Sequence, residues 1–158
     1  MQMEETLYSR VRDQFTQYLN ELQLRKTEER YAILELICSY DGHFDCGQLY
    51  TDMEKSRFHV SRATVYNTLD VLEQARLVVR HQFLTQAVQY ELRDRALTHL
   101  HLICQHCGLI REIPLTELET AFSSIRIPRF KPETYCLYVY GTCNRCKKRQ
   151  GKAVKQEM

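Results

Sequence analysis

The chain has 158 residues, of which 44% are hydrophobic and 27% charged, and this composition is typical of a folded protein with room for one ordinary domain or two small ones. No apolar run approaches the roughly 18 residues of a membrane span, and the first residues lack the apolar core of a signal peptide, so we expect a cytoplasmic protein without a membrane partner. The net charge of +2 is unevenly distributed, because residues 1–92 carry ten basic against fourteen acidic residues and residues 93–158 carry twelve against six. The acidic balance of the first part does not by itself indicate contact with DNA.

Four helices are predicted in the first 75 residues. Apolar side chains recur at intervals of three and four from Thr6 to Leu24, which indicates an amphipathic helix. Thr27 is a suitable N-cap for a second helix that ends before Asp41-Gly42. A third helix is expected over residues 46–55, and a fourth begins at the N-cap Ser61 and continues to about residue 75.

Strands follow the helices. Alternating apolar residues over 78–83 and 88–92 predict a two-stranded ribbon, so residues 1–92 are interpreted as a winged helix-turn-helix domain. Polar residues 93–96 form a candidate hinge. Residues 97–146 predict a small α+β domain with antiparallel strands, including a helix over 116–125 and a strand over 135–140. Residues 147–158 are basic and favour a mobile tail.

Two Cys-x-x-Cys pairs, Cys104 with Cys107 and Cys143 with Cys146, give the strongest chemical signal. Each pair can present two thiolates to one tetrahedral zinc ion, and four sulfur ligands leave no open position for a reacting water molecule. The pattern therefore predicts a structural zinc site and argues against a hydrolytic enzyme. Gly108 follows the first pair, where the lack of a Cβ permits a tight turn.

A second candidate metal site centres on His99 and His101, which alternation within a strand places on one face. Candidate partners from elsewhere in the chain are His43, Glu91 and Glu112. Imidazole and carboxylate ligands together suit Zn, Fe(II), Mn or Co, and the ligand types alone do not choose among these metals.

The fourth predicted helix has the features of a DNA recognition helix. Its N-terminal part carries Arg62, Thr64, Tyr66 and Asn67. Arg and Asn can make paired hydrogen bonds to guanine and adenine, while Tyr and Thr can contact phosphates or thymine methyl groups. An ordinary solvated surface helix is the alternative.

The order of these motifs resembles the ferric uptake regulator family over roughly residues 25–146. The resemblance is carried by Ala-Thr-Val-Tyr at residues 63–66, by His-Leu-His-Leu-Ile-Cys-x-x-Cys-Gly at 99–108 and by Leu-Tyr-Val-Tyr-Gly-x-Cys-x-x-Cys at 137–146. It implies a metal-activated repressor, which is not an enzyme, whose homodimer binds an inverted repeat in promoter DNA through its winged helix and dimerises through its second domain. It also implies that Arg25 reaches the minor groove from the loop before the second helix.

The resemblance implies a regulatory metal site formed by His43, Glu91, His99, His101 and Glu112. A further site found in many iron-responsive members would fall on Thr98, Leu100, Glu119 and Tyr135. Only Glu119 among these is a plausible ligand, so we expect this site to be absent.

Fe(II) is the preferred regulatory effector, with Mn(II), Zn(II), haem and peroxide as alternatives. Asn67 resembles the peroxide-sensing branch of the family, whereas the carboxylate of Glu91 resembles members with slow or no peroxide reaction. Cys38, Cys46 and Cys136 are interpreted as small buried hydrophobes. Outside this family, the alternatives are a protein-binding zinc-ribbon adaptor and a cysteine-based redox enzyme, both of which explain the zinc pairs incompletely.

Overall fold

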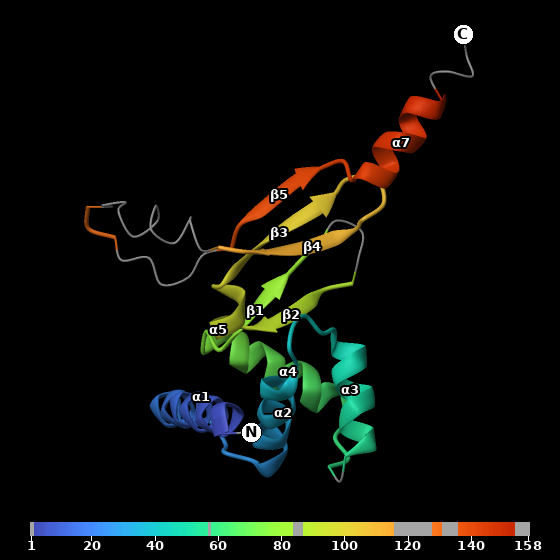
Figure 1. Ribbon diagram of the computed structural model, residues 1–158. Coiled ribbons are helices and arrows are strands. Elements are labelled where there is room, and N and C mark those ends of the chain that lie inside the picture. Colours follow the sequence, from blue (N-terminus) through green and yellow to red (C-terminus); the bar gives the residue numbers. More distant parts are fainter. Residues whose placement is uncertain (1, 57, 84–86, 116–127, 131–135, 154–158) are drawn as a thin grey trace. The chain divides into compact units, whose positions relative to one another are not determined.

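The structure, a computed structural model, describes residues 2–56, 58–83, 87–115, 128–130 and 136–153 (Figure 1). It divides into two compact units. One, the helical unit, comprises residues 1–82 and 87–95, and the other, the sheet unit, comprises residues 83–86 and 96–158. None of the described helices has the length and apolar character that crossing a membrane requires.

The helical unit contains four helices followed by a β-hairpin. Its elements are α1 (Gln2–Glu21), α2 (Glu28–Ser39), α3 (Cys46–Lys55), α4 (Arg62–Gln74), β1 (Val78–His81) and β2 (Gln89–Leu92), after which the four-residue helix α5 (Arg93–Ala96) reaches the sheet unit. This order confirms the expected helices and ribbon, and together with the sheet unit it confirms the α+β class with an N-terminal winged helix.

Polar caps fix where three of these helices begin. The Thr27 hydroxyl accepts the amide hydrogen of Arg30, and the Ser61 hydroxyl accepts that of Thr64 at 3.1 Å, as the sequence predicts. The carboxylate of Asp45 does the same for α3, at 2.8 Å from the amide nitrogen of Gln48. Each cap satisfies an amide that has no partner within its own helix.

One hydrophobic core holds the helical unit together, and every helix and both strands contribute to it. Fully buried members include Phe15, Leu34, Leu49 and Leu69. The loop before α3 is joined to the hairpin by a β-bridge, in which Phe44 and Tyr90 exchange backbone hydrogen bonds of 2.9 and 2.7 Å. This bridge brings the residues beside Phe44 close to β2.

The described residues of the sheet unit form three strands, β3 (His99–Cys104), β4 (Ile110–Pro114) and β5 (Tyr138–Gly141), in the order β4-β3-β5. The expectation of antiparallel strands throughout is wrong, because β3 pairs antiparallel with β4 but parallel with β5. β4 lies between these two strands in the chain and runs opposite to both, so β5 begins at the end of the sheet where β4 ends. The helix expected between β4 and β5, over 116–125, lies outside the described residues.

The end of the sheet unit also differs from the sequence prediction. Helix α7 spans Asn144–Ala153, so the segment from Lys147 to Ala153 is helical, whereas the sequence favoured a mobile tail from residue 147. The amide of Lys147 donates to the carbonyl of Cys143 at 2.9 Å, so α7 begins at the second cysteine pair. Lys, Arg and Gln are good helix formers, so their charge does not prevent the helix from continuing.

Candidate functional site

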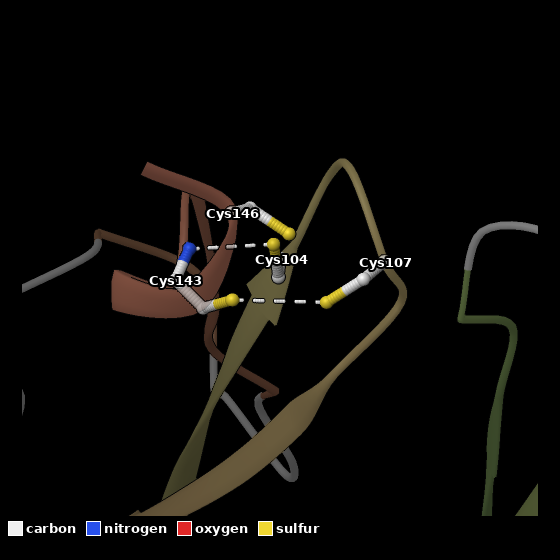
Figure 2. Close-up of side chains that lie close together, drawn as sticks. All are labelled: Cys104, Cys107, Cys143 and Cys146. Atoms are coloured by element: carbon white, nitrogen blue, oxygen red, sulfur yellow. Dashed lines mark hydrogen bonds between the residues drawn. The ribbon is translucent and has the colours of Figure 1, made fainter. Parts of the chain in front are cut away.

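The four paired cysteines lie together at one end of the sheet unit, as Figure 2 shows. Cys104 ends β3 and Cys107 lies in the turn before β4, while Cys143 precedes α7 and Cys146 lies in its first turn. All four sulfur atoms lie within 4.8 Å of one another, and the sulfurs of Cys107 and Cys143 are 3.7 Å apart. Two loops far apart in sequence thus present their thiols to one point.

This geometry fits a tetrahedral zinc ion. With Zn–S bonds of about 2.3 Å, two sulfurs at the corners of a tetrahedron are separated by about 3.8 Å. The distance between Cys107 and Cys143 agrees with that separation. The cluster therefore suits a closed structural site, in which every position around the metal is taken by sulfur.

Backbone groups around the first pair support thiolates. Gly108 has a φ of 70°, in the left-handed region, and its amide donates to the carbonyl of Cys104 at 2.9 Å. The amide of Cys143 donates to the sulfur of Cys104 at 3.3 Å (Figure 2). This hydrogen bond, helped by the amides of His106 and Cys107, lowers the pKa of Cys104 to about 6.

The pKa values of Cys107 and Cys146 move in opposite directions. The Leu109 amide lowers the pKa of Cys107, whereas hydrogen bonding to Cys107 raises the pKa of Cys146 to about 12. Neighbouring thiolates repel one another, so the backbone alone favours only part of the set in the ionised form. A bound cation supplies the opposite charge that four thiolates require.

Two of the predicted regulatory ligands lie in the helical unit. His43 immediately precedes the bridge between Phe44 and Tyr90, and Glu91 is the next residue after Tyr90 on β2. The bridge therefore sets the two side chains beside each other, with Nε2 of His43 at 3.3 Å from Oε2 of Glu91.

The other three predicted ligands lie in the sheet unit. His99 and His101 alternate with leucines on β3, and their Nε2 atoms are 3.2 Å apart. Glu112 on β4 is the direct partner of His101 in the antiparallel register. The ring of Tyr138 stacks on His101 with a centroid distance of 5.5 Å, which restricts the orientation of the imidazole. One face of this sheet thus carries imidazole and carboxylate side chains.

A further histidine belongs with this chemistry and was not among the predicted site residues. His81, the last residue of β1, places Nε2 at 3.5 Å from Oε2 of Glu91. Its alternation with Val79 and Leu77 was visible in the sequence, but its register with β2 was not. A hairpin with its turn at residues 85 and 86 would pair His81 with Tyr90. The observed partner of His81 is Gln89, and this register puts His81 on the same face of the hairpin as Glu91.

The predicted DNA contacts gather at the beginning of α4. Arg62, Tyr66 and Asn67 are exposed, and Tyr66 keeps 51% of its surface accessible. The guanidinium of Arg62 lies 4.4 Å from the ring centroid of Tyr50, and the hydroxyl of Thr64 is 2.9 Å from that of Ser61, so Thr64 takes part in the helix cap. Arg25 is exposed in the loop between α1 and α2, where its carbonyl accepts a hydrogen bond from Arg30.

The residues considered for a further metal site lie only partly within the described part of the chain. Leu100 lies on β3 between the two histidines and points to the opposite face, while Glu119 and Tyr135 lie outside the described residues. Cys38 and Cys46 belong to the core of the helical unit, and burial raises the pKa of Cys38 to about 11. Cys136 is half-buried in the sheet unit.

Comparisons with known proteins connect these features to a family. A model of the ferric uptake regulator family matches residues 21–140. The chain is 30% identical over 156 residues to the ferric uptake regulation protein of Campylobacter jejuni, which covers 96% of this chain and 98% of that protein. It is 29% identical over 133 residues to the peroxide operon regulator of Bacillus subtilis, with coverages of 84% and 90%. The structure is similar to that of the ferric uptake regulator from Pseudomonas aeruginosa with manganese, with a TM-score of 0.68, 28% identity, and coverages of 82% and 97%.

Proposed function

Since the chain belongs to the ferric uptake regulator family of metal-responsive transcriptional regulators, we propose that it is an Fe(II)-activated repressor that binds inverted repeats in promoter DNA as a homodimer. The observation that carries this proposal is the division of ligand-bearing side chains between the two units. His43 and Glu91 belong to the helical unit, whereas His99, His101 and Glu112 belong to the sheet unit. A metal ion that binds both sets would connect the DNA-reading unit to the dimerising unit.

The regulatory set fits a divalent transition metal. Nitrogen and oxygen ligands of this kind suit Fe(II), Mn(II) and Zn(II). The iron assignment is supported by the 30% identity to a protein named for ferric uptake regulation, and peroxide sensing is the second candidate because of the relative in Bacillus subtilis. When bound, the ion supplies a shared positive charge that several imidazoles and carboxylates can contact together.

The four cysteines are assigned to structural Zn(II), because their sulfurs match the edge of a tetrahedral site. We assign no catalytic residue, since a site closed by four sulfurs offers no position for a substrate. A zinc-ribbon adaptor or a cysteine-based redox enzyme would leave the winged helix and the imidazole face without a role.

Dimerisation is assigned to the sheet unit. The register of the strands sets the sheet unit's predicted metal ligands on one face of the sheet, and mainly apolar side chains, with Arg111, on the other. Ile113 and Val139 on that apolar face are 42% and 44% exposed, and Leu109 beside it is 41% exposed. Apolar surface of this kind is stabilised when a second copy covers it.

The helical unit is assigned to DNA. Arg62, Tyr66 and Asn67 face outward from α4 and can contact base edges and phosphates in the major groove, and Arg25 can reach a neighbouring phosphate or the minor groove. Because the proposed binding partner is promoter DNA, we place the protein in the cytoplasm. The proposed hinge is the short helix α5 (residues 93–96), which lies between the DNA-binding domain (residues 1–92) and the dimerisation domain (97–146) in the chain.

Activation follows from the hinge. If the two units move freely, the two α4 helices of a dimer have no fixed spacing. The two halves of an inverted repeat match only one spacing of these helices. When both units contribute ligands, the metal binds more tightly to the arrangement in which all ligands reach it than to arrangements in which the units move freely. This difference in metal affinity favours that one arrangement. A change from 1:99 to 99:1 in favour of that arrangement needs about 5.5 kcal/mol.

The test is an anaerobic DNA-binding titration of the zinc-loaded protein with Fe(II), Mn(II), Zn(II) and haem as separate arms. We expect Fe(II) to raise affinity for an inverted repeat and His99→Ala or His101→Ala to abolish this gain with the cysteine-bound zinc still present. His59→Ala, which changes an exposed histidine outside both ligand sets, is the matched control and should keep the gain on adding Fe(II). An unchanged Fe(II) response in His99→Ala would refute the assignment, and loss of DNA binding on adding peroxide would favour the second candidate.

A further inference from the structure

His81 joins His43 and Glu91 within the helical unit, and the three residues come from three different segments. His43 lies in the loop before α3, His81 ends β1, and Glu91 lies on β2. The bridge between Phe44 and Tyr90 fixes the first segment against the third, and the hairpin register fixes the second against the third. The backbone of one unit therefore sets all three side chains.

The donor atoms of these residues converge. Nε2 of His43 and Nε2 of His81 lie 3.3 and 3.5 Å from the same carboxylate oxygen of Glu91. The two imidazole rings have centroids 5.0 Å apart and planes inclined by 76°, so they meet edge to face rather than stacking in parallel. All three donor atoms lie within 4.8 Å of one another.

These separations suit the coordination shell of a small divalent ion. With metal–nitrogen and metal–oxygen bonds of about 2.1 Å, neighbouring ligand atoms of a tetrahedral shell are about 3.4 Å apart. The distances from Glu91 to both histidines agree with that value. Two imidazoles and one carboxylate form a ligand set that leaves other positions around the metal open.

We propose that His81 is a metal ligand, and that His43, His81 and Glu91 form a half-site in the helical unit that binds a divalent transition metal before the sheet unit contributes. The link from this half-site to DNA binding rests on the proposed function, but the half-site itself does not. The open positions would accept the imidazoles of His99 and His101. Metal would then load onto the helical unit with moderate affinity, and its affinity would rise when the sheet-unit ligands join.

The first experiment titrates the full chain, with zinc held in the cysteine site, with Co(II). Cobalt bound by nitrogen and oxygen has visible ligand-field bands that respond to the number and type of its ligands. We expect His81→Ala to weaken Co(II) binding at least about tenfold and to change the shape and intensity of these bands. His59→Ala removes an exposed histidine of the same unit and should change neither.

The spectrum separates a ligand from a residue that only positions Glu91. Loss of a supporting hydrogen bond can also cost 10–100-fold in metal affinity, but it leaves the set of ligands intact. Unchanged Co(II) affinity in His81→Ala, or weakened affinity with an unchanged spectrum, would overturn the proposal. His81→Gln, compared by thermal melting, provides a second variant of similar size in case His81→Ala does not fold.

The second experiment uses the double variant His99→Ala/His101→Ala, which lacks the imidazoles of the sheet unit. Residual Co(II) binding is expected in this background, and adding His81→Ala should remove it. Complete loss of Co(II) binding in the double variant alone would overturn the half-site. Neither experiment measures DNA binding. The half-site can therefore be supported or rejected independently of the proposed repressor function.

Discussion

The helical unit buries hydrophobic side chains from four helices and both strands of a hairpin, whereas the described part of the sheet unit buries few. The buried hydrophobic residues described in the sheet unit are Phe83, Ala96, Ile103, Cys104, Leu115 and Cys146. Two of these six are members of the cysteine cluster. We therefore expect apolar burial to stabilise the helical unit, and the proposed zinc and the proposed dimer contact to stabilise the sheet unit.

Removing a zinc ligand should have the largest effect, and it tests whether the two units are stabilised in different ways. Cys104→Ser should release the structural zinc and unfold the sheet unit, because apparent binding free energies of structural zinc reach about 10–16 kcal/mol and are also folding free energies. Zinc analysis and size-exclusion chromatography should show loss of metal and of dimer together, with the helical circular dichroism of the other unit largely retained. Cys136→Ser, outside the cluster, is the control. A Cys104→Ser protein that remains dimeric with a full complement of zinc would contradict the contrast.

The converse change weakens the helical unit. Phe15 is fully buried and meets the ring of Tyr31 edge to face at 5.9 Å. Phe15→Ala should lower the free energy of unfolding of this unit by about 3–5 kcal/mol, because it removes apolar contact and leaves a cavity. Denaturant unfolding checks the magnitude, and Gln14→Ala on the exposed side of the same helix should change it by less than about 0.5 kcal/mol. Release of zinc by Phe15→Ala would show that the two units are not stabilised independently.

The DNA contacts are expected to follow the same division, since they lie in the helical unit alone. Asn67→Ala should reduce discrimination between a cognate and a mutated repeat by about 1–3 kcal/mol, because it removes a contact to a base. Arg25→Ala should weaken binding to both sequences alike and lower the slope of affinity against salt by about one. Fluorescence anisotropy at several salt concentrations measures both effects. Unchanged specificity in Asn67→Ala would mean that α4 does not read the sequence.

The smallest expected effect concerns a helix cap in the helical unit. The hydroxyl of Ser61 accepts the amide of Thr64, so Ser61→Ala should cost about 1 kcal/mol of stability and loosen the first turn of α4. Thermal unfolding would detect this change. Ser9→Ala, at an exposed position within α1, provides a comparison that removes the same hydroxyl without a cap. A loss of equal size in Ser9→Ala would argue against a capping role for Ser61.

The local signals in the sequence predicted the helical unit well, because its elements depend on nearby residues. Thr27 and Ser61 were recognised as caps from residue type alone, and α3 has the predicted bounds. The paired cysteines were likewise visible from their spacing. These features need no knowledge of which distant segments pair.

Features that depend on long-range pairing were predicted less well. The parallel alignment of β5 with β3 depends on which strand edge a segment far along the chain joins, and periodicity does not reveal this. His81 was missed because a shift of one residue in the hairpin register reverses the face on which it lies. The helical state of residues 147–153 was missed because a run of basic residues suggested a solvated tail, while the cysteine turn that starts the helix lies before it.

Coupling between metal and DNA is the central claim, and its most direct measurement is the Fe(II) affinity of the zinc-loaded dimer with and without an inverted-repeat duplex. Thermodynamic linkage requires the duplex to raise metal affinity by the same factor by which metal raises DNA affinity. A factor of about 5–150 corresponds to the usual coupling of about 1–3 kcal/mol. We predict equal factors for the unaltered protein and no coupling in His99→Ala. Fe(II) affinity that is the same with and without the duplex would contradict the account.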